Sequence, residues 1–347
     1  MQKLRILHLS DDRPGHYHLS EGVMAALGRL RETSVERVQV GRRRVLPARL
    51  LRAMSTGPDA ARQAVLQFGY GISPAALPAA DLVISAGGET LPANVAAARI
   101  LGAANIFIGS LRGMDAENFS LVVTSYARHA RRPRHLVTLK PSSLDPDELG
   151  RAKGTPGLDA GARPRLAGLL IGGDSGLFHY RDDEWHAVFS FARAASRALG
   201  LRWLVSTSRR TPPPIAEAAF ELAKDKDVVA DFLDYRLAGP GSLNRIFSRA
   251  DVILCSEDSS TMISEAVWAR LPVIGFSPAD HAFKAEEAEY RAMMEAENWC
   301  RFIPIGELSV ERFGEALREV RPLAENPLDR LARELDKRLP ELTQGGG

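Results

Sequence analysis

The sequence contains only two cysteines in 347 residues, Cys255 and Cys300. Cys255 lies inside an apolar run that is typical of a buried strand, so the sequence argues against a disulfide framework and predicts a reducing compartment. No apolar run approaches the roughly 18 residues of a membrane-spanning helix, and the run at residues 4–9 is too short for a signal peptide. We therefore expect a cytoplasmic protein, which leaves open a peripheral position on the inner face of a membrane.

The sequence also has few aromatic residues and a small net charge. Aromatic residues make up 7% of the chain, the formal net charge is +2, and no long basic block is present. These features argue against a dedicated nucleic-acid binder, and we expect no nucleic-acid partner. Hydrophobic residues at 45% and charged residues at 25% are ordinary for a folded protein. At ~150 residues per domain, the length indicates about two domains.

Several chemical signatures are missing as well. No G-x-G-x-x-G follows the first predicted strand, and neither a phosphate-binding G-x-x-x-x-G-K-[ST] loop nor a G-x-S-x-G nucleophile elbow occurs. No histidine or cysteine set has the spacing of metal ligands. The one D-x-D sequence, Asp225-Lys226-Asp227, lies at a charged helix end that is typical of a solvated surface. The sequence therefore predicts no metal and no required cofactor.

What the sequence does contain is a regular alternation of apolar runs and amphipathic segments, which predicts parallel sheets covered by helices. The first half has six candidate strands, at residues 4–9, 35–40, 82–85, 105–108, 121–124 and 136–139. The second half has six more, at residues 166–171, 201–206, 228–232, 252–255, 273–276 and 302–305. Between them, residues 141–165 are rich in Pro, Gly and Asp and predict a linker. The expected fold class is α/β, with two Rossmann-like, doubly wound domains, residues 1–140 and 166–325, facing a cleft.

In the first half, polar residues follow three successive predicted strands. Asp12, Gly15 and His16 follow the first, and Asp12 or His16 is a candidate base for an acceptor hydroxyl. Gly87-Gly88-Glu89-Thr90 follows another strand, with Glu89 as a second candidate base, and Arg112 follows the next. Glycines allow a ligand to approach the backbone. Capped turns with exposed polar side chains would produce the same residues, so both interpretations stay open.

In the second half, the matching loops predict a phosphate site. Gly172-Gly173 follows the first strand and suits a close approach of a diphosphate, although a plain turn would look alike. Thr207, Arg209 and Arg210 follow the next strand, beside a proline that opens a helix. Arginines in that position bind phosphate, and the alternative is a capped helix with solvated arginines.

The stretch Ser256–Ala266 is the most informative part of the sequence. Glu257 follows a predicted strand, and Ser259-Ser260-Thr261 stands at a predicted helix start, where hydroxyls and the helix dipole can bind phosphate oxygens. Glu265 lies one turn after Thr261, on the same helix face, and can accept both ribose hydroxyls. An ordinary serine cap explains one hydroxyl but not the cluster.

A basic amphipathic segment follows the second predicted strand. Arg42-Arg43-Arg44, Arg49 and Arg52 alternate with aliphatic residues over residues 42–54. Such a segment can rest on anionic lipid, and the alternative is a solvated helix face.

These motifs, in this order, resemble the "elongated mitochondria" fission-protein family, whose architecture is similar to the GT-B fold of nucleotide-sugar enzymes. The resemblance rests on Asp12–His16, Gly87–Thr90, Gly109-Ser110-Leu111-Arg112, Ile171-Gly172-Gly173, Thr207–Pro212 and Ser256–Ala266. One departure is that the Pro-x-His-Asp stretch expected after the strand at 121–124 is replaced by Thr124-Ser125-Tyr126-Ala127-Arg128.

The resemblance implies a metal-independent glycosyltransferase that uses a nucleotide sugar. The second domain would bind the donor and the first an acceptor, which we expect to be a lipid or glycolipid at a membrane surface. It also implies that part of residues 325–342 returns to pack on the first domain. A nucleotide-sugar epimerase or hydrolase and a non-catalytic membrane-associated adaptor are the alternatives.

Overall fold

The computed structural model describes residues 3–43, 45–149, 164–239 and 241–344. The chain divides into two units: unit 1 is Met1–Ser143 with Pro327–Gly347, and unit 2 is Leu144–Asn326. The chain therefore passes from one unit to the other twice, at residues 143–144 and 326–327. The first passage lies in the predicted linker at 141–165, of which residues 150–163 fall outside the described part.

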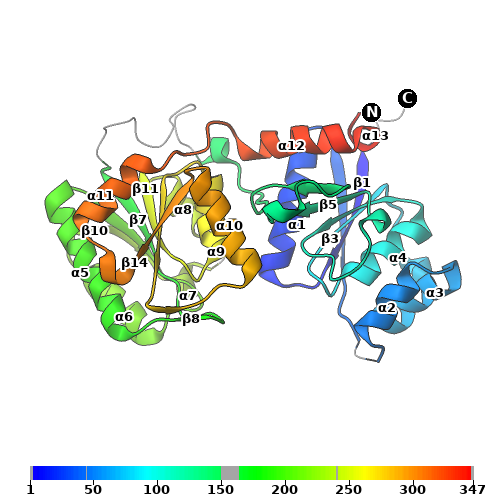
Figure 1. Ribbon diagram of the computed structural model, residues 1–347, viewed down its shortest axis with the longest axis horizontal. Coiled ribbons are helices and arrows are strands. Elements are labelled where there is room, and N and C mark those ends of the chain that lie inside the picture. The colour runs from blue at the N-terminus through cyan, green and yellow to red at the C-terminus, as the bar shows by residue number, and fades with distance from the viewer. Residues whose placement is uncertain (1–2, 44, 150–163, 240, 345–347) are drawn as a thin grey trace. The chain divides into compact units, whose positions relative to one another are not determined.

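Unit 1 is built on a six-stranded parallel sheet in the order β2-β1-β3-β4-β5-β6 (Figure 1). The strands are β1 Leu4–Ser10, β2 Thr33–Gln39, β3 Leu82–Ala86, β4 Ala104–Ile108, β5 Leu121–Thr124 and β6 His135–Val137. The inner strands are continuous apolar runs because helices cover both faces of the sheet. The order reverses between β1 and β3, which is where ligands bind in open α/β sheets.

The helices of unit 1 cover the two sheet faces separately. α1 (Pro14–Gly28) packs on β1 and β3, and α12 (Pro327–Arg338) packs on α1, followed by α13 (Pro340–Thr343). α4 (Leu91–Leu101) packs on β3 and β4 and is joined by α2 (Ala48–Ser55), α3 (Asp59–Ala64) and the π-helical turn η1 (Val65–Tyr70). Right-handed crossovers place α1 and α4 on opposite faces, because their connections run in opposite directions along the sheet.

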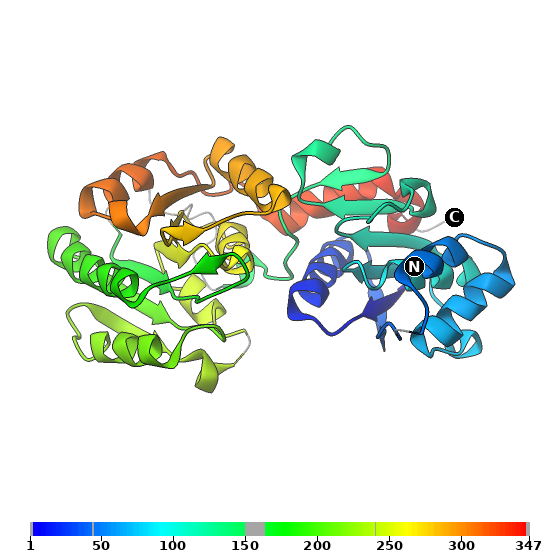
Figure 2. The same cartoon turned by 60° about the horizontal axis from the view of Figure 1, so that its bottom comes forward.

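Unit 2 repeats the design with the strand order of Rossmann folds, β10-β9-β7-β11-β12-β14 (Figure 2). Its parallel strands are β7 Leu166–Leu170, β9 Arg202–Ser206, β10 Val229–Leu233, β11 Val252–Ser256, β12 Val273–Ser277 and β14 Cys300–Pro304. The order reverses between β7 and β11. A separate antiparallel pair, β8 (Phe178–His179) with β13 (Asp280–His281), joins the loops that follow β7 and β12.

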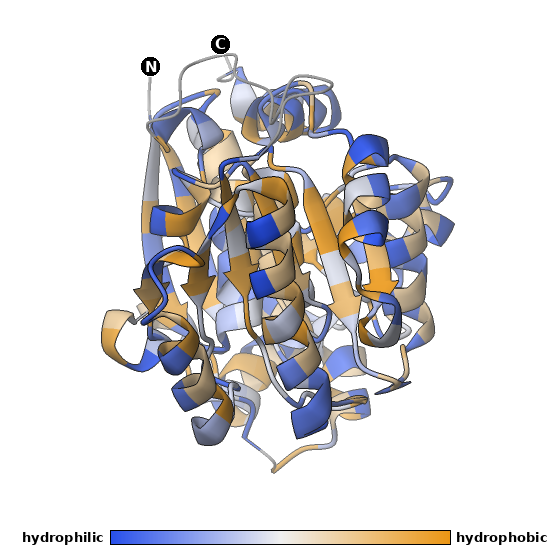
Figure 3. Ribbon diagram, turned by 90° about the vertical axis from the view of Figure 1, so that its left-hand side faces the viewer, coloured by the Kyte–Doolittle hydropathy of each residue, from blue (hydrophilic) through white to orange (hydrophobic). Residues whose placement is uncertain are grey.

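Helices and short helical turns complete unit 2. α5 (Asp182–Leu199), α6 (Pro213–Leu222) and α11 (Val310–Glu319) pack over one core with the sheet. α9 (Ser260–Trp268) packs on β11 and β12, and α10 (Ala285–Ala296) on β14. Shorter elements are α7 (Tyr235–Ala238), α8 (Asn244–Phe247) and η6 (Ile305–Glu307). Figure 3 shows the result: strands are largely hydrophobic, and the surrounding helices alternate hydrophobic and hydrophilic residues.

These sheets confirm the predicted fold class of two Rossmann-like units. Each parallel sheet has six strands, as the sequence indicated, at positions within about two residues of the predicted ones. The β8–β13 pair was not predicted, because two-residue strands have no periodicity to detect.

Candidate functional site

The strand order of unit 2 brings the loops after β7 and β11 together at the point where the order reverses. The backbone N–H of Gly172 donates to Ser256 Oγ over 2.7 Å. A Cβ at Gly172 would collide with the carboxylate of Asp258, and one at Gly173 would collide with the backbone carbonyl of Arg210. Both glycines are therefore required by the chain's own packing, and a close approach of a diphosphate to them remains a prediction.

Asp258 is the residue around which this loop is organised. Its side chain is fully buried and accepts from Arg210, with Nη2 at 2.5 Å and Nε at 3.1 Å from Oδ2. The hydroxyl of Tyr180 donates to the other carboxylate oxygen over 3.2 Å. Burial raises the pKa of Asp258, and the guanidinium of Arg210 opposes that shift. Arg210 is thereby held in one orientation at the reversal point.

The other basic and hydroxyl residues after β9 lie in different environments. Thr207 is buried, and its Oγ1 accepts from the backbone N–H of Tyr235 over 3.0 Å. The Thr207 hydroxyl therefore stabilises the start of α7 at Tyr235. Arg209 is exposed and has no ion-pair partner among the residues that the structure describes. Of the two arginines, Arg210 is the fixed one and Arg209 the free one.

The hydroxyl cluster stands at the start of α9, as predicted. Ser259 is the N-cap residue, yet its side chain makes no capping hydrogen bond, and the first turn carries no acidic residue. Ser259 is buried, Ser260 is half-buried and Thr261 is exposed. Because no acidic residue lies in the first turn, the positive end of the helix dipole favours an anion at this N-terminus.

Glu265 is half-buried on α9, one turn beyond Thr261. Burial alone raises the pKa of its carboxyl to about 7, and no described residue donates a hydrogen bond or a charge to it. A half-buried carboxyl without a partner loses part of its hydration without compensation. Among the described residues of α9, the Glu265 carboxyl has no protein partner and is therefore available to a ligand.

Glu257, in contrast, has a partner within its own unit. Its carboxylate accepts from Arg291 Nε over 2.7 Å, and both side chains are buried. The guanidinium of Arg291 lies over the ring of Phe283, 4.2 Å from its centroid, and beside Phe178. Arg291 also donates to the backbone carbonyl of Glu257. This group fixes the loop after β11 against α10, a contact that sequence analysis missed.

In unit 1 the strand order likewise brings together the loops after β1 and β3. His16 Nδ1 lies 2.8 Å from Asp11 Oδ2, and the imidazole rests on Gly87, where any Cβ would collide with the ring. The His16 side chain is 31% exposed and that of Asp11 is 7% exposed. With the Asp11 carboxylate on Nδ1, Nε2 is the ring nitrogen without a hydrogen-bond partner among the described residues.

Asp12 points to a different partner from His16. Its backbone has a φ of +58°, and its carboxylate accepts from Arg37 over 2.6 Å. The sequence put forward Asp12 with His16, whereas the structure joins Asp11 to His16. Two adjacent acidic residues after a strand signalled the loop, but the turn at Asp12 decides which of them faces the histidine. A Cβ at Gly15 would meet no atom within 4 Å, and this glycine serves the first turn of α1.

The loops after β3 and β4 carry the other predicted acceptor-side residues. Arg112, from the loop after β4, lies over Gly88 and is exposed. Glu89 is paired with Arg42, whose Nε lies 2.5 Å from Oε2, and the Tyr70 hydroxyl donates to the Glu89 carbonyl over 2.6 Å. Thr90 is fully buried, and its Oγ1 lies 3.0 Å from the carbonyl oxygen of Gly87. His16, Gly87, Gly88 and Arg112 thus meet, while Glu89 is engaged elsewhere.

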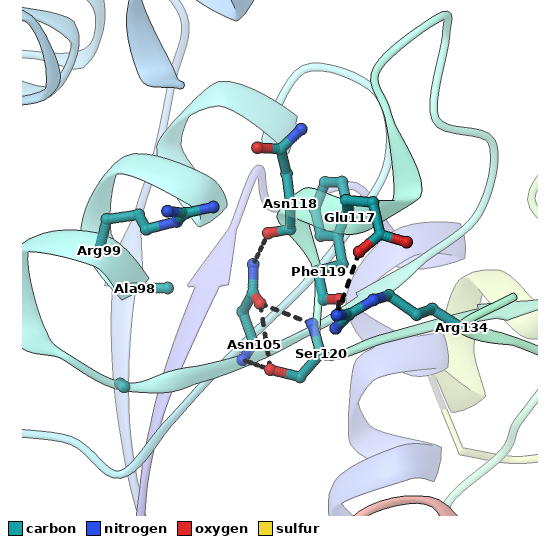
Figure 4. A pocket seen from close by; sticks show the side chains of 9 residues that line it. Ala98, Arg99, Asn105, Glu117, Asn118, Phe119, Ser120 and Arg134 are labelled. Carbon is teal, nitrogen blue, oxygen red and sulfur yellow. Dashed lines mark hydrogen bonds and ion pairs between the residues drawn. The ribbon is translucent and has the colours of Figure 1, made fainter. Parts of the chain in front are cut away.

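A buried polar chain supports this loop from below. Thr90 donates to Ser85 Oγ, Asn94 donates to the same atom, and Asn105 donates to Asn94 Oδ1, over 2.8–3.0 Å. Asn105 also lines a pocket of about 150 Å³ at the amino-terminal ends of β4 and β5 (Figure 4). The pocket includes Arg99 and the ion pair of Arg134 with Glu117, and it contains no predicted site residue.

Metal ligands and membrane spans were searched for separately. Within the described ranges, no group of three or more His, Cys, Asp or Glu side chains is arranged to hold a metal ion. No helix of the described chain is both long and apolar enough to cross a membrane.

Comparison with known families decides the relationship. The family model for Mitochondrial fission ELM1 matches residues 14–339. The chain belongs to this family. Among curated protein sequences, none matches the chain significantly. The matched range contains the loops after β3, β4, β7, β9 and β11, and it begins after Asp11 and Asp12 in the loop after β1.

Solved structures with the same fold are distant in sequence. A glycosyltransferase from Rickettsia africae aligns at a TM-score of 0.53 and 10% identity, covering 100% of both chains. A UDP-GlcNAc 2-epimerase from Methanocaldococcus jannaschii gives 0.53 and 13%, covering 97% of this chain and 100% of that one. MurG from Acinetobacter baumannii gives 0.51 and 14%, covering 96% and 99%. At these identities the likeness shows the GT-B-like fold alone.

Proposed function

We propose that this ELM1-family protein is a metal-independent glycosyltransferase that moves a sugar from a nucleotide sugar to an acceptor hydroxyl. Unit 2 binds the donor. The N-terminus of α9, with Ser259, Ser260 and Thr261, holds phosphate oxygens, and Glu265 accepts the ribose hydroxyls. Arg209 and Arg210 offset the remaining phosphate charge beside Gly172 and Gly173, while Thr207 and Glu257 hold the surrounding loops.

Unit 1 activates the acceptor. His16 Nε2 takes the proton of the acceptor hydroxyl, and Asp11 stabilises the imidazolium that forms. The acceptor oxygen forms a bond to the anomeric carbon as the bond from that carbon to the diphosphate breaks. The leaving diphosphate keeps the electron pair, and the arginines and helix dipole of unit 2 stabilise its charge in place of a metal ion.

The observation that carries this proposal is the Asp11–His16 pair, with 2.8 Å between Asp11 Oδ2 and His16 Nδ1. The imidazole of this pair rests on Gly87. A carboxylate-oriented imidazole with its second nitrogen open is what hydroxyl deprotonation needs. Asp12 and Glu89 are weaker candidates for the base, because each carboxylate already faces an arginine. Gly88, Thr90 and Arg112 shape the acceptor side.

The acceptor is, in this proposal, a lipid or glycolipid, and the protein works in the cytoplasm at the inner face of a membrane. The basic segment at residues 42–54 supports this placement, since it combines arginines with aliphatic residues. No nucleic-acid partner is proposed.

Two other functions use the same fold. An epimerase or hydrolase would act on the nucleotide sugar without a separate acceptor, and one structural neighbour is an epimerase. A non-catalytic membrane-associated adaptor is the other alternative, since the family's description names mitochondrial fission and no reaction. Neither alternative requires an acceptor, whereas the transferase does.

A panel of nucleotide sugars, incubated with the purified protein and extracted membrane lipids, separates the three functions. We expect nucleoside diphosphate to be released only when lipid acceptors are present. Release or isomerisation without acceptor would assign the epimerase or hydrolase, and no turnover with any donor would assign the adaptor. A His16→Ala variant is the control, because release that survives it does not use the proposed base.

A further inference from the structure

Between β2 and β3 the chain of unit 1 leaves the sheet and forms α2, α3 and η1, a region we call the excursion (residues 42–70). Five arginines lie in its first part, and no Asp or Glu occurs between Arg37 and Asp59. Figure 1 shows α2 and α3 side by side next to α4. The described part of the excursion, residues 42–43 and 45–70, therefore consists of contacting helices, and residues 38–58 carry positive charge without acidic residues.

Three large apolar side chains of the excursion face solvent. Val45 is 74% exposed, Leu50 is 45% exposed and Phe68 is 58% exposed. Other apolar residues of the excursion are buried: Leu51, Val65 and Leu66 are fully buried in the core beneath α4. Of the large apolar residues exposed in the described part of unit 1, only Val35 lies outside this region.

The exposed apolar residues come from segments that contact each other. Leu51 packs against Gly69, where a Cβ would lie 2.7 Å from the leucine side chain. Leu50 precedes Leu51 in α2 and Phe68 precedes Gly69 in η1, so the two exposed side chains come from elements that contact each other. Arg49 and Arg43 are exposed beside them, and Arg52 is half-exposed.

The excursion is also tied to the acceptor loop at both of its ends. Arg42, at its start, pairs with the Glu89 carboxylate, and Tyr70, at its end, donates to the Glu89 carbonyl. Glu89 follows Gly87 and Gly88, on which His16 and Arg112 rest. A surface that holds the excursion would therefore hold the loop that carries the proposed acceptor site.

We propose that the excursion docks on an anionic lipid bilayer, with Val45, Leu50 and Phe68 in the acyl boundary and Arg43, Arg49 and Arg52 on lipid phosphates. Charge complementarity selects this partner, because an acid-free arginine cluster beside aliphatic residues matches an anionic headgroup layer over hydrocarbon. The docking extends the proposed function, since a lipid-borne acceptor would be delivered next to His16.

Sedimentation with lipid vesicles tests the docking without any assay of transfer. We expect the full chain to bind vesicles of phosphatidylcholine with phosphatidylglycerol, and to bind pure phosphatidylcholine far more weakly. A doubly neutralised variant, Arg49→Gln with Arg52→Gln, should lose about fivefold per arginine at low salt. Leu50→Ser with Phe68→Ser should weaken binding to the same anionic vesicles at least tenfold.

Matched controls come from unit 2. Phe220→Ser removes an apolar side chain of similar exposure, 53%, and Arg197→Gln removes an exposed arginine of α5. Neither should change vesicle binding. Circular dichroism verifies that each excursion variant is folded, and an unchanged affinity for a nucleoside diphosphate verifies that unit 2 is unaffected.

Three results would overturn the docking: no binding to anionic vesicles, equal binding to neutral ones, or equal losses in the unit 2 controls. If Leu50→Ser with Phe68→Ser instead dissociates an oligomer in gel filtration while vesicle binding persists, the surface belongs to a second copy of the chain. A His16→Ala variant must still bind vesicles, so a failure of transfer is distinguishable from a failure of docking.

Discussion

The two points of strand-order reversal use their glycine pairs in different ways. In unit 2, Gly172 makes room for the fully buried carboxylate of Asp258, and Gly173 for a backbone carbonyl. In unit 1, Gly87 makes room for His16, whose side chain is partly exposed, and Gly88 for the exposed Arg112. The first arrangement produces a rigid platform, and the second brings reactive side chains to the surface. The same sequence signal therefore accompanies a loop filled by buried groups in one unit and a loop covered by partly exposed side chains in the other.

The largest expected effect is on the chemical side of this comparison. His16→Ala should reduce the rate of transfer by about 10²–10⁴-fold, because the acceptor proton loses its base. The measurement is the single-turnover rate with the donor that the panel identifies. His18→Ala is the matched control: His18 lies in the same helix and pairs with Glu21. Similar losses in both variants would mean that the effect comes from α1 and not from the base.

On the platform side, Asp258→Asn should lower the free energy of unfolding by about 3–5 kcal/mol, because Arg210 loses the buried carboxylate that it faces. Denaturant unfolding measures this value. Asp231→Asn provides the comparison, because the Asp231 carboxylate pairs with Arg245 and Arg249 nearer the surface. This variant should lower the free energy of unfolding by about 1 kcal/mol or less. Equal losses would show that Asp258 is no more structural than an ordinary surface acid.

Glu265 adds a pH dependence to unit 2. Its pKa is raised from 4.5 to about 7 in the folded chain, so the folded state keeps a proton that the unfolded state releases. Stability should therefore fall as the pH rises from about 4.5 to 7 and level off above, by about 3 kcal/mol at most. Glu265→Gln should remove this slope in unfolding measurements between pH 5 and 8. An unchanged slope would assign it to other groups.

A smaller effect concerns ligand specificity. If Glu265 accepts the ribose hydroxyls, the wild type should bind a ribonucleoside diphosphate about tenfold more tightly than its 2′-deoxy form at pH 8, where the carboxyl is ionised. Glu265→Gln should reduce this preference, and Glu297→Gln, a helix-end acid elsewhere in unit 2, should keep it. Calorimetry with both nucleotides measures the four affinities. A preference that survives in Glu265→Gln would place the ribose elsewhere.

Local sequence patterns were sufficient for the strands, the glycine loops and the start of α9. They were insufficient where a partner comes from far along the chain. Glu257 is paired with Arg291, 34 residues later, and Glu89 with Arg42, 47 residues earlier. Neither pairing leaves a mark in the local pattern, so both carboxylates looked open. The choice between Asp11 and Asp12 was likewise decided by the φ of Asp12 and by Arg37 of β2. The position of Glu265 one turn after Thr261 could be predicted because helix spacing alone determines it, and its role toward a ribose stays a prediction.

The division of labour between the two units is tested most directly by the affinity of two variants for a nucleoside diphosphate, measured by calorimetry at pH 8. The account predicts that His16→Ala binds the diphosphate as the wild type does, because unit 1 acts on the acceptor. It predicts that Glu265→Gln binds about tenfold more weakly, because unit 2 holds the ribose. The opposite pattern, with affinity lost in His16→Ala and kept in Glu265→Gln, would contradict the account.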